Sequence, residues 1–304
     1  MSHKYTSVNE YLKNKYGEKI YKLSIDAGMT CPNRDGRLGT GGCIFCSEGG
    51  SGDFAFGKDE RYSCTAQDIV RQLSDAKSLI EAKSDCHKFI AYFQAFTNTY
   101  APVDYLREVF YAAAEQPDIE ILSIATRCDC LSDEVINLLA GLNEIKPVWI
   151  EMGLQSVYPS TLSYIKCGYT YGQFEESTYR LKEAGIDVIA HLILGLPCET
   201  EDMMLKSVDR VCSLPIQGIK LQLLHVLKGT ELAKIYENEP FHIMSMDEYC
   251  SLIVKCIDRI PSDIIIHRMT GDGPRRLLIE PKWSTDKKRV LNTLKHMLQS
   301  EQAH

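Results

Sequence analysis

The sequence predicts an α/β fold organised around a parallel β-sheet. Six apolar segments of strand length alternate with segments of helical periodicity between residues 20 and 230. Strands that are joined in this way run parallel and are connected by right-handed crossovers. With 304 residues, 44% of them hydrophobic, the chain can bury a substantial core. The alternation alone leaves two architectures open, a doubly wound sheet and a barrel-like sheet.

The six predicted strands are short, and a helical segment follows each of them. They cover residues 20–25, 89–93, 119–125, 148–152, 188–194 and 219–226. The first strand, IYKLSI, alternates in hydrophobicity and leads directly into a loop that contains cysteines.

Capping residues mark the ends of several predicted helices. Thr65 and Asp68 match a capping box ahead of apolar residues at helical spacing. Ser132 is placed to cap a second helix. Gly185 supplies the left-handed residue that ends a helix at 174–184.

The order of elements changes after residue 230. We expect a short helix at 231–236, a second helix capped by Ser245, and one more strand at 263–267. The turn MTGDGPRR then precedes a terminal helix that is opened by Ser284. No linker-like segment interrupts this part of the chain, so it is expected to pack on the main domain as an extension.

The chain is therefore divided into an N-terminal basic arm (1–19), a main domain (20–230) and a C-terminal extension (231–304). The formal net charge of −7 argues against a protein that coats nucleic acids generally. Residues 1–22 nevertheless hold five lysines against two glutamates, and residues 272–304 hold seven Lys or Arg against four acids. Basic ends on an acidic body are suited to placing a phosphate-bearing substrate over a central site.

Composition also bears on where the protein works. No run reaches the roughly 18 uncharged apolar residues of a membrane span, and the start, MSHKYTSVNE, lacks the apolar segment of a secretory signal. Twelve cysteines fit a reducing compartment, because secreted disulfide frameworks are typical of shorter chains. We therefore expect a cytoplasmic protein with no membrane partner.

Three cysteines lie close together in the loop after the first strand. Cys31 is followed by eleven residues, after which Cys43 and Cys46 form the motif C-I-F-C. The glycines between them let the backbone turn, so that three thiolates can converge on one metal centre. A structural zinc normally takes four protein ligands, whereas three thiolates on a four-iron cluster leave one iron open. A zinc clip remains the alternative interpretation.

Polar residues follow the predicted strands at the end where ligands bind in parallel α/β folds. Besides the cysteine loop they comprise Gln94 with residues 97–99, residues 126–129, Gln155 with Ser156, residues 195–199, and His225 with residues 228–230. Six such sets on one rim, one of them the metal-binding loop, predict an active site there.

These features resemble the radical S-adenosylmethionine (SAM) superfamily, with Phe45 in the aromatic position before the last cysteine, where the resemblance makes it a cofactor-binding residue. The gap of eleven residues is longer than is usual there, and it is similar to the branch that includes the Elongator catalytic subunit. The segments CPNRDG and GGCIFC look like a bacterial subgroup near that branch. The resemblance covers residues 20–230. It implies a partial (β/α)6 barrel with a C-terminal α/β extension, a 4Fe-4S cluster on Cys31, Cys43 and Cys46, and SAM as its ligand.

The resemblance also assigns SAM contacts residue by residue. Gln94, Thr97 and Asn98 lie where the superfamily holds the methionine amino group. Gln155 and Ser156, in GLQS, match the segment that contacts the ribose and carboxylate region.

Four further positions complete this assignment. Gly195 and Leu196, in ILGLPCE, are similar to the fifth-strand motif that packs against adenine, and Leu227 is a second adenine candidate. Thr126 begins the segment TRCD, which parallels TRPD in the Elongator relatives. No residue is assigned a catalytic role.

The family chemistry that the resemblance implies is reductive cleavage of SAM to a 5′-deoxyadenosyl radical, with an electron donor such as flavodoxin or ferredoxin. The Elongator likeness and the basic ends favour a tRNA substrate, with the wobble uridine as the hypothesis. The sequence carries no additional acetyltransferase domain, so acetyl transfer is not implied. Two alternatives stay open: a radical SAM enzyme for a small molecule or cofactor precursor, and a zinc-stabilised binding module without radical chemistry.

Overall fold

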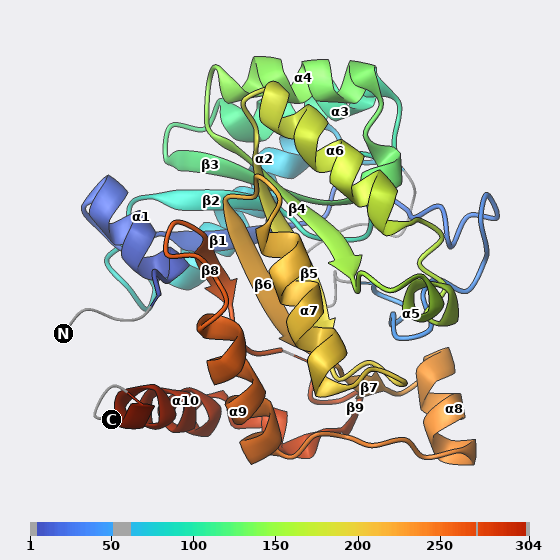
Figure 1. Cartoon of the computed structure of the whole chain (residues 1–304). Helices are drawn as coiled ribbons and strands as arrows, with labels where there is room; N and C mark the ends of the chain where they lie inside the picture. The colour runs from blue at the N-terminus through green and yellow to red at the C-terminus, as the bar shows by residue number, and fades with distance from the viewer. Residues whose placement is uncertain (1–4, 51–61, 272, 302–304) are drawn as a thin grey trace.

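A parallel sheet forms the centre of the computed structural model, which describes residues 5–50, 62–271 and 273–301 (Figure 1). Its strands follow the order β1-β2-β3-β4-β5-β6-β8. They are β1 (Tyr21–Ile25), β2 (Phe89–Phe93), β3 (Ile119–Arg127), β4 (Val148–Gln155), β5 (Asp187–Leu194), β6 (Gly218–Leu223) and β8 (Ile265–Arg268). The sheet curls into a partial barrel, which confirms the predicted fold class with one strand more than six.

The seventh strand, β8, comes from the C-terminal extension and pairs with β6. Two short strands, β7 (Val226–Leu227) and β9 (Leu278–Glu280), form a separate antiparallel pair. The sixth predicted strand, at 219–226, is therefore wrong in its last part, because the chain leaves the main sheet after Leu223 and then pairs with β9.

Helices cover the outer face of the sheet, and α8, α9 and α10 from the C-terminal part of the chain lie below it in the view of Figure 1. They are α1 (Val8–Tyr16), α2 (Ala66–Glu81), α3 (Val103–Ala114), α4 (Asp133–Asn143), α5 (Pro159–Tyr164), α6 (Tyr171–Glu183), α7 (Glu201–Cys212), α8 (Glu231–Asn238), α9 (Met246–Ile257) and α10 (Lys287–Glu301), with the 3-10 helices η1 (Cys128–Cys130) and η2 (Lys282–Thr285). Within the described ranges, no helix combines the length and the apolar character that crossing a bilayer requires.

Local capping explains where several helices begin. The Thr65 side chain accepts from the backbone of Asp68, whose carboxylate accepts in return, so the predicted capping box is confirmed. Ser132 caps α4 as predicted. Ser284 does not open the last helix: it lies in η2, and Asp286 instead accepts from a backbone N–H in the first turn of α10 at 3.1 Å.

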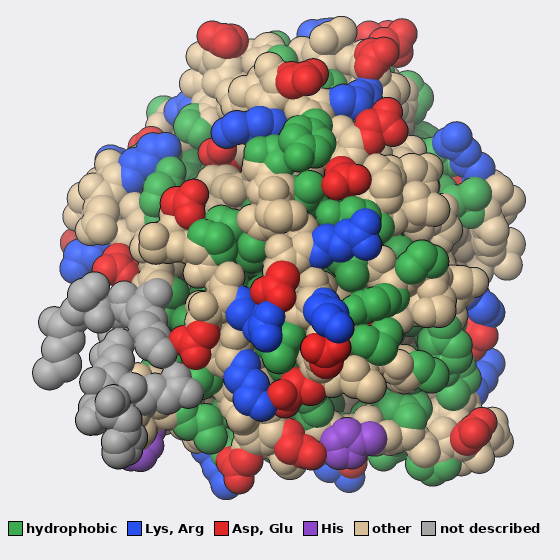
Figure 2. Space-filling model, viewed as in Figure 1, with side chains coloured by type: hydrophobic (Ala, Val, Ile, Leu, Met, Phe, Trp, Pro, Cys, Tyr) green, Lys and Arg blue, Asp and Glu red, His purple; other side chains and the backbone are tan. Residues whose placement is uncertain are grey.

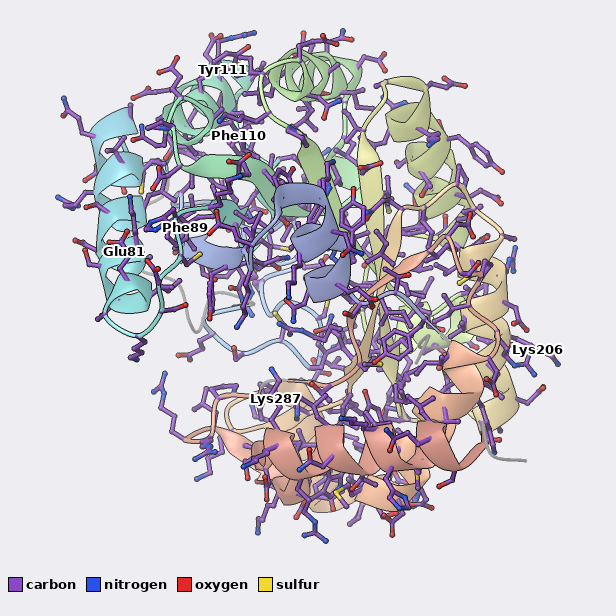
Figure 3. The ribbon with its side chains drawn as sticks, turned by 90° about the vertical axis from the view of Figure 1, so that its left-hand side faces the viewer. Glu81, Phe89, Phe110, Tyr111, Lys206 and Lys287 are labelled. Atoms are coloured by element: carbon purple, nitrogen blue, oxygen red, sulfur yellow. The ribbon has the colours of Figure 1, made fainter. Side chains whose placement is uncertain are left out.

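Helix α1 closes the barrel interior at the N-terminal ends of the strands. Figure 3 looks onto this end, and α1 lies in front of the strands there. Its Leu12 packs into a buried apolar cluster with five residues of the barrel, namely Ile20, Ile90, Ile121, Trp149 and Ile189. This apolar plug separates the barrel interior from solvent at the N-terminal ends of the strands.

Candidate active site

The barrel interior holds a cavity of about 300 Å³ above the α1 plug. Cys31, Cys43 and Cys46 all line it, so the structure brings the three predicted metal ligands to one cavity. The opposite part of its lining comes from side chains within the strands, among them Glu151 and Lys220. The cavity therefore combines soft sulfur donors from the cysteine loop with charged groups from the strands.

The cysteine loop is held by its own backbone. The Cys31 carbonyl accepts from Arg34 N at 2.8 Å, and Cys46 N donates to the Cys43 carbonyl at 2.9 Å. Gly42 has a φ of 77°, which few other residues adopt readily, and its N–H donates to the Asn33 carbonyl at 2.8 Å. These turns bring the distant parts of the motif together.

Hydrogen-bond donors and cationic side chains lie beside the three thiols. Asn33 Nδ2 lies 3.4 Å from Cys43 Sγ, and Arg127 Nη1 lies 3.7 Å from Cys31 Sγ. Burial raises the pKa of Cys46 to about 11, while the guanidinium of Arg34 opposes this rise. A thiol loses its proton when it ligates a metal, and Asn33 and Arg34 are placed to interact with Cys43 and Cys46 in that state.

Within residues 5–50, 62–271 and 273–301, no three or more His, Cys, Asp or Glu side chains are grouped so as to hold one metal ion.

Arg127 connects the thiols to the rest of the wall. Its guanidinium pairs in a bidentate manner with Asp129, at 2.8 Å for each contact. It also lies 4.9 Å from the centre of the Tyr169 ring. The two hydrogen bonds to Asp129 thus hold the charged guanidinium of Arg127 beside Cys31.

Six of the ten residues predicted to contact SAM line the same cavity. These are Phe45, Gln94, Thr97, Thr126, Gln155 and Leu227. Whether they touch SAM remains a prediction, although the structure places them around one space with the three thiols.

The other four predicted residues do not line the cavity. Asn98 Nδ2 donates to two backbone carbonyls of the barrel at 3.0 Å, and Ser156 is hydrogen-bonded to Glu199. A Cβ on Gly195 would lie 2.7 Å from Met244 Cε, so a protein side chain fills the space beside it. Leu196 is buried in the core.

Gln155 combines two features that are typical of ligand sites. It is the last residue of β4 and has a φ of 74°, an uncommon backbone conformation for a residue other than glycine. Its Oε1 is buried and has no hydrogen-bond partner among the described residues. An orphaned acceptor on a cavity wall fits a ligand with N–H or O–H donors, and SAM carries an ammonium group, hydroxyls and an adenine amine.

The sequence analysis missed a group of charged residues inside the barrel. Glu151 contacts Lys22, Lys220 and His191, and Arg268 lines the cavity near them. Burial alone would raise the pKa of Glu151, but the two ammonium groups outweigh it and hold that pKa well below its usual range. The sequence did contain a signal for this group: Glu151 and Lys220 are charged residues within the otherwise apolar strand segments VWIEMG and GIKLQL.

His225 joins the C-terminal extension to the cavity wall. A Cβ on Gly271 would lie 2.2 Å from the ring of His225, and one on Gly273 would lie 3.2 Å from it. On its other side, Nε2 lies 3.1 Å from Ser284 Oγ. The glycines of the TGDGP turn are thus needed to accommodate a histidine that lines the cavity.

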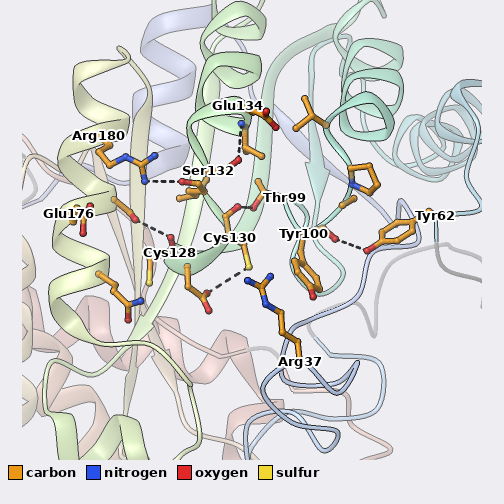
Figure 4. Close-up of a pocket in the computed structure, with 18 residues that line it drawn as sticks. Arg37, Tyr62, Thr99, Tyr100, Cys128, Cys130, Ser132, Glu134, Glu176 and Arg180 are labelled. Carbon is orange, nitrogen blue, oxygen red and sulfur yellow. Dashed lines mark hydrogen bonds between the residues drawn. The ribbon is translucent and has the colours of Figure 1, made fainter.

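A second, more open hollow of about 700 Å³ is lined by residues that include Arg37, Cys128, Asp129 and Cys130 (Figure 4). Arg37 points towards Cys130 there. Burial raises the pKa of Cys128 to about 12 and also raises that of Cys130, so both thiols stay protonated at neutral pH. The three predicted metal ligands do not line this hollow.

A partial α/β barrel with three thiols at an interior cavity defines the class of protein. Residues 34–211 match the family description of the radical SAM superfamily, and residues 216–300 match that of its C-terminal domain. The chain belongs to the radical SAM superfamily and is a radical SAM enzyme. Members of this family use a 4Fe-4S cluster and SAM.

Individual relatives agree with this assignment. The chain is 42% identical over 297 residues to the uncharacterised protein YtqA of Bacillus subtilis, covering 98% of this chain and 90% of YtqA. It is 26% identical over 162 residues to a tRNA uridine(34) acetyltransferase of Methanocaldococcus infernus, covering 52% of this chain and 30% of that protein.

A solved structure shares the fold. The Elp3 of Methanocaldococcus infernus, with an N-terminal deletion, matches with a TM-score of 0.66 at 17% identity over 91% of this chain and 63% of that one. The position near the Elongator branch that the cysteine spacing predicted is thereby confirmed.

Proposed function

We propose that Cys31, Cys43 and Cys46 hold a 4Fe-4S cluster that binds SAM, and that the enzyme modifies a tRNA, with the wobble uridine as its target. The observation that carries the first part is that three thiols share one cavity with the orphaned acceptor Gln155 Oε1. When bound, the cluster and SAM supply a 5′-deoxyadenosyl radical, which removes hydrogen from a substrate.

The residues of this chain serve that chemistry by positioning and shielding. Ile193, Leu223 and Leu224 give the cavity an apolar wall, which excludes water from a reactive site. The carboxylate of Asp129 holds the Arg127 guanidinium beside Cys31, with Nη1 3.7 Å from its Sγ. Gln155, held at the end of β4, orients the donor groups of a bound ligand.

The first test is anaerobic reconstitution of the full chain with iron and sulfide. We expect one four-iron cluster per chain and release of 5′-deoxyadenosine when SAM and a reductant are added. Cys43→Ala should lose both, because two thiolates do not hold the cluster. Cys198→Ala, which changes an exposed thiol outside the cavity, is the matched control. Zinc bound stoichiometrically, without 5′-deoxyadenosine, would instead favour the binding module.

Two observations support a tRNA substrate. One is the similarity to tRNA uridine(34) acetyltransferases, of which this chain spans about a third. The other is the placement of the basic ends: α1, with Lys13 and Lys15, and α10, with Lys287, Lys288 and Arg289, both lie on the side that faces the viewer in Figure 3. By contrast, acidic and basic side chains are intermixed on the face in Figure 2.

The second test compares modified nucleosides in tRNA from cells with and without the gene. We expect one modified uridine to disappear or to be replaced by a precursor. An unchanged profile would remove the tRNA proposal and favour a small molecule or cofactor precursor as substrate. The electron donor and the cytoplasmic location stay predictions.

A further inference from the structure

One ion pair contributes to the walls of both the cavity and the larger hollow. Arg127, the last residue of β3, lines the cavity of the three thiols, whereas Asp129 of η1 lines the hollow. The pair is largely buried, with 8% of the Arg127 side chain and 16% of the Asp129 side chain exposed. A buried pair of charges therefore lies next to the predicted metal ligands.

The guanidinium of Arg127 uses different nitrogens for its two polar partners. Nε and Nη2 donate to the two carboxylate oxygens of Asp129, each at 2.8 Å. Nη1 instead lies 3.7 Å from Cys31 Sγ. The carboxylate thus contacts one edge of the planar guanidinium, and the nitrogen outside that edge is the one that reaches the sulfur. The positive charge is therefore closer to Cys31 than the negative charge that balances it.

A short segment after α5 keeps the guanidinium in this position. The ring centre of Tyr169 lies 4.9 Å from Arg127 Cζ. The preceding residue, Gly168, has a φ of 79°, and a Cβ on it would lie 3.5 Å from Arg127 Nη2. The aromatic ring and the carboxylate of Asp129 both contact the guanidinium, so its approach to Cys31 is a fixed feature of the fold.

A charge in this position acts on a cluster that Cys31 ligates. Reduction adds one electron, so the reduced cluster is more negative than the oxidised one. A hydrogen bond or a cation at a ligand sulfur stabilises the reduced form more strongly and raises the reduction potential. A carboxylate nearby has the opposite effect. Because Arg127 and Asp129 are largely buried, solvent screens both effects only weakly.

We propose that Arg127 and Asp129 together set the reduction potential of the cluster that the three cysteines hold. Arg127 raises the potential through Cys31, and Asp129, which is farther from the sulfur, reverses part of that rise. Both are positioning residues, because they act through a ligand of the cluster. The cluster then accepts its electron from a weaker reductant than the three thiolates alone would require. This inference rests on the proposed function only in that the cysteines bind a 4Fe-4S cluster.

The test measures the reduction potential of the anaerobically reconstituted full chain without SAM. Electron paramagnetic resonance counts the reduced cluster at a series of solution potentials, at constant pH and salt. In Arg127→Gln, the ratio of reduced to oxidised cluster at a given potential should fall about tenfold, because a charged contact is lost and the charge of Asp129 is no longer balanced. For one electron this corresponds to a downward shift of about 59 mV.

Asp129→Asn should move the potential upwards, because it removes the negative charge and leaves the cation beside Cys31. A pair that only shapes the turn at η1 would be disturbed by either substitution, and it gives no reason for shifts of opposite sign. Arg259→Gln is the matched control. It also removes one positive charge, but from an exposed pair with Asp209, and it should leave the potential unchanged.

The inference is overturned if Arg127→Gln has the potential of the wild type, or if Arg127→Gln and Asp129→Asn shift it in the same direction. If Arg127→Gln binds no cluster, Asp129→Asn decides: a higher potential supports the inference, and an unchanged or lower one overturns it. A wild-type chain that binds no 4Fe-4S cluster removes the proposed function and the inference together. A wild-type cluster whose potential neither substitution alters removes the inference alone.

Discussion

His191 illustrates how single residues in the barrel depend on their surroundings. It lies in β5 between Glu151 and Gln222, at 3.2 Å and 3.5 Å. A histidine within an apolar strand can face either the barrel interior or the outer core. The structure places it on the cavity wall, where burial decides its protonation.

Its titration leads to a prediction for stability. The pKa of His191 falls to about 4 in the folded chain from 6.5. Between these values the unfolded chain binds a proton that the folded chain does not, so stability should decrease as pH falls from 6.5 to 4, by about 3 kcal/mol for this residue. Above pH 6.5 its contribution should be constant. Urea unfolding at several pH values measures this slope.

His191→Gln should flatten that slope, because the replaced side chain no longer titrates. His242→Gln changes an exposed histidine and should leave the slope as it is in the wild type. An equal slope in wild type and His191→Gln would show that other groups cause the pH dependence.

At the scale of elements, α1 is the helix whose role the sequence least revealed. The sequence marks it as a short helix in a basic arm, and nothing local indicates that its apolar side enters the barrel. Leu12 is 2% exposed, and the Tyr11 and Trp149 rings lie 6.4 Å apart. The helix is thus part of the core.

Leu12→Ala should reduce the free energy of unfolding by about 2–5 kcal/mol, because it leaves a cavity in the plug. Asn14→Ala alters an exposed position of the same helix and should change stability by no more than about 0.5 kcal/mol. Denaturant titration of both variants provides the comparison. A similar loss in both would mean that helix propensity, not the plug, matters.

Elements with strong local signals were predictable from the sequence. The capping box at Thr65 and the apolar strands gave positions close to those observed. The helix α5 was missed because a segment of six residues offers too little periodicity to detect. The charged group inside the barrel (Lys22, Glu151, His191, Lys220 and Arg268) could not be derived, because its members come from five strands and meet only when the sheet curls.

At the scale of the whole molecule, the extension is joined to the barrel at several points. β8 completes the sheet, and Leu232 N donates to the Ile44 carbonyl of the cysteine loop at 2.8 Å. His225 packs against the turn at Gly271 and Gly273. The division at residue 230 therefore separates two segments of the sequence, and both segments contribute strands to the same sheet.

We accordingly expect the chain to unfold in one cooperative step. Calorimetry should show a single transition, and a fragment that ends at residue 230 should fail to fold, because β6 loses its neighbour β8. Two separate transitions, or a folded fragment, would establish independent domains.

The contribution of β8 also has a consequence for how the protein is made. Translation proceeds from the N-terminus, so the three cysteines leave the ribosome more than two hundred residues before Arg268 does. The nascent chain therefore exposes its metal ligands while the opposite wall of their chamber has yet to be synthesised. Iron delivery that precedes release would meet an unfinished enzyme, and the order of maturation is set by the position of one strand in the gene.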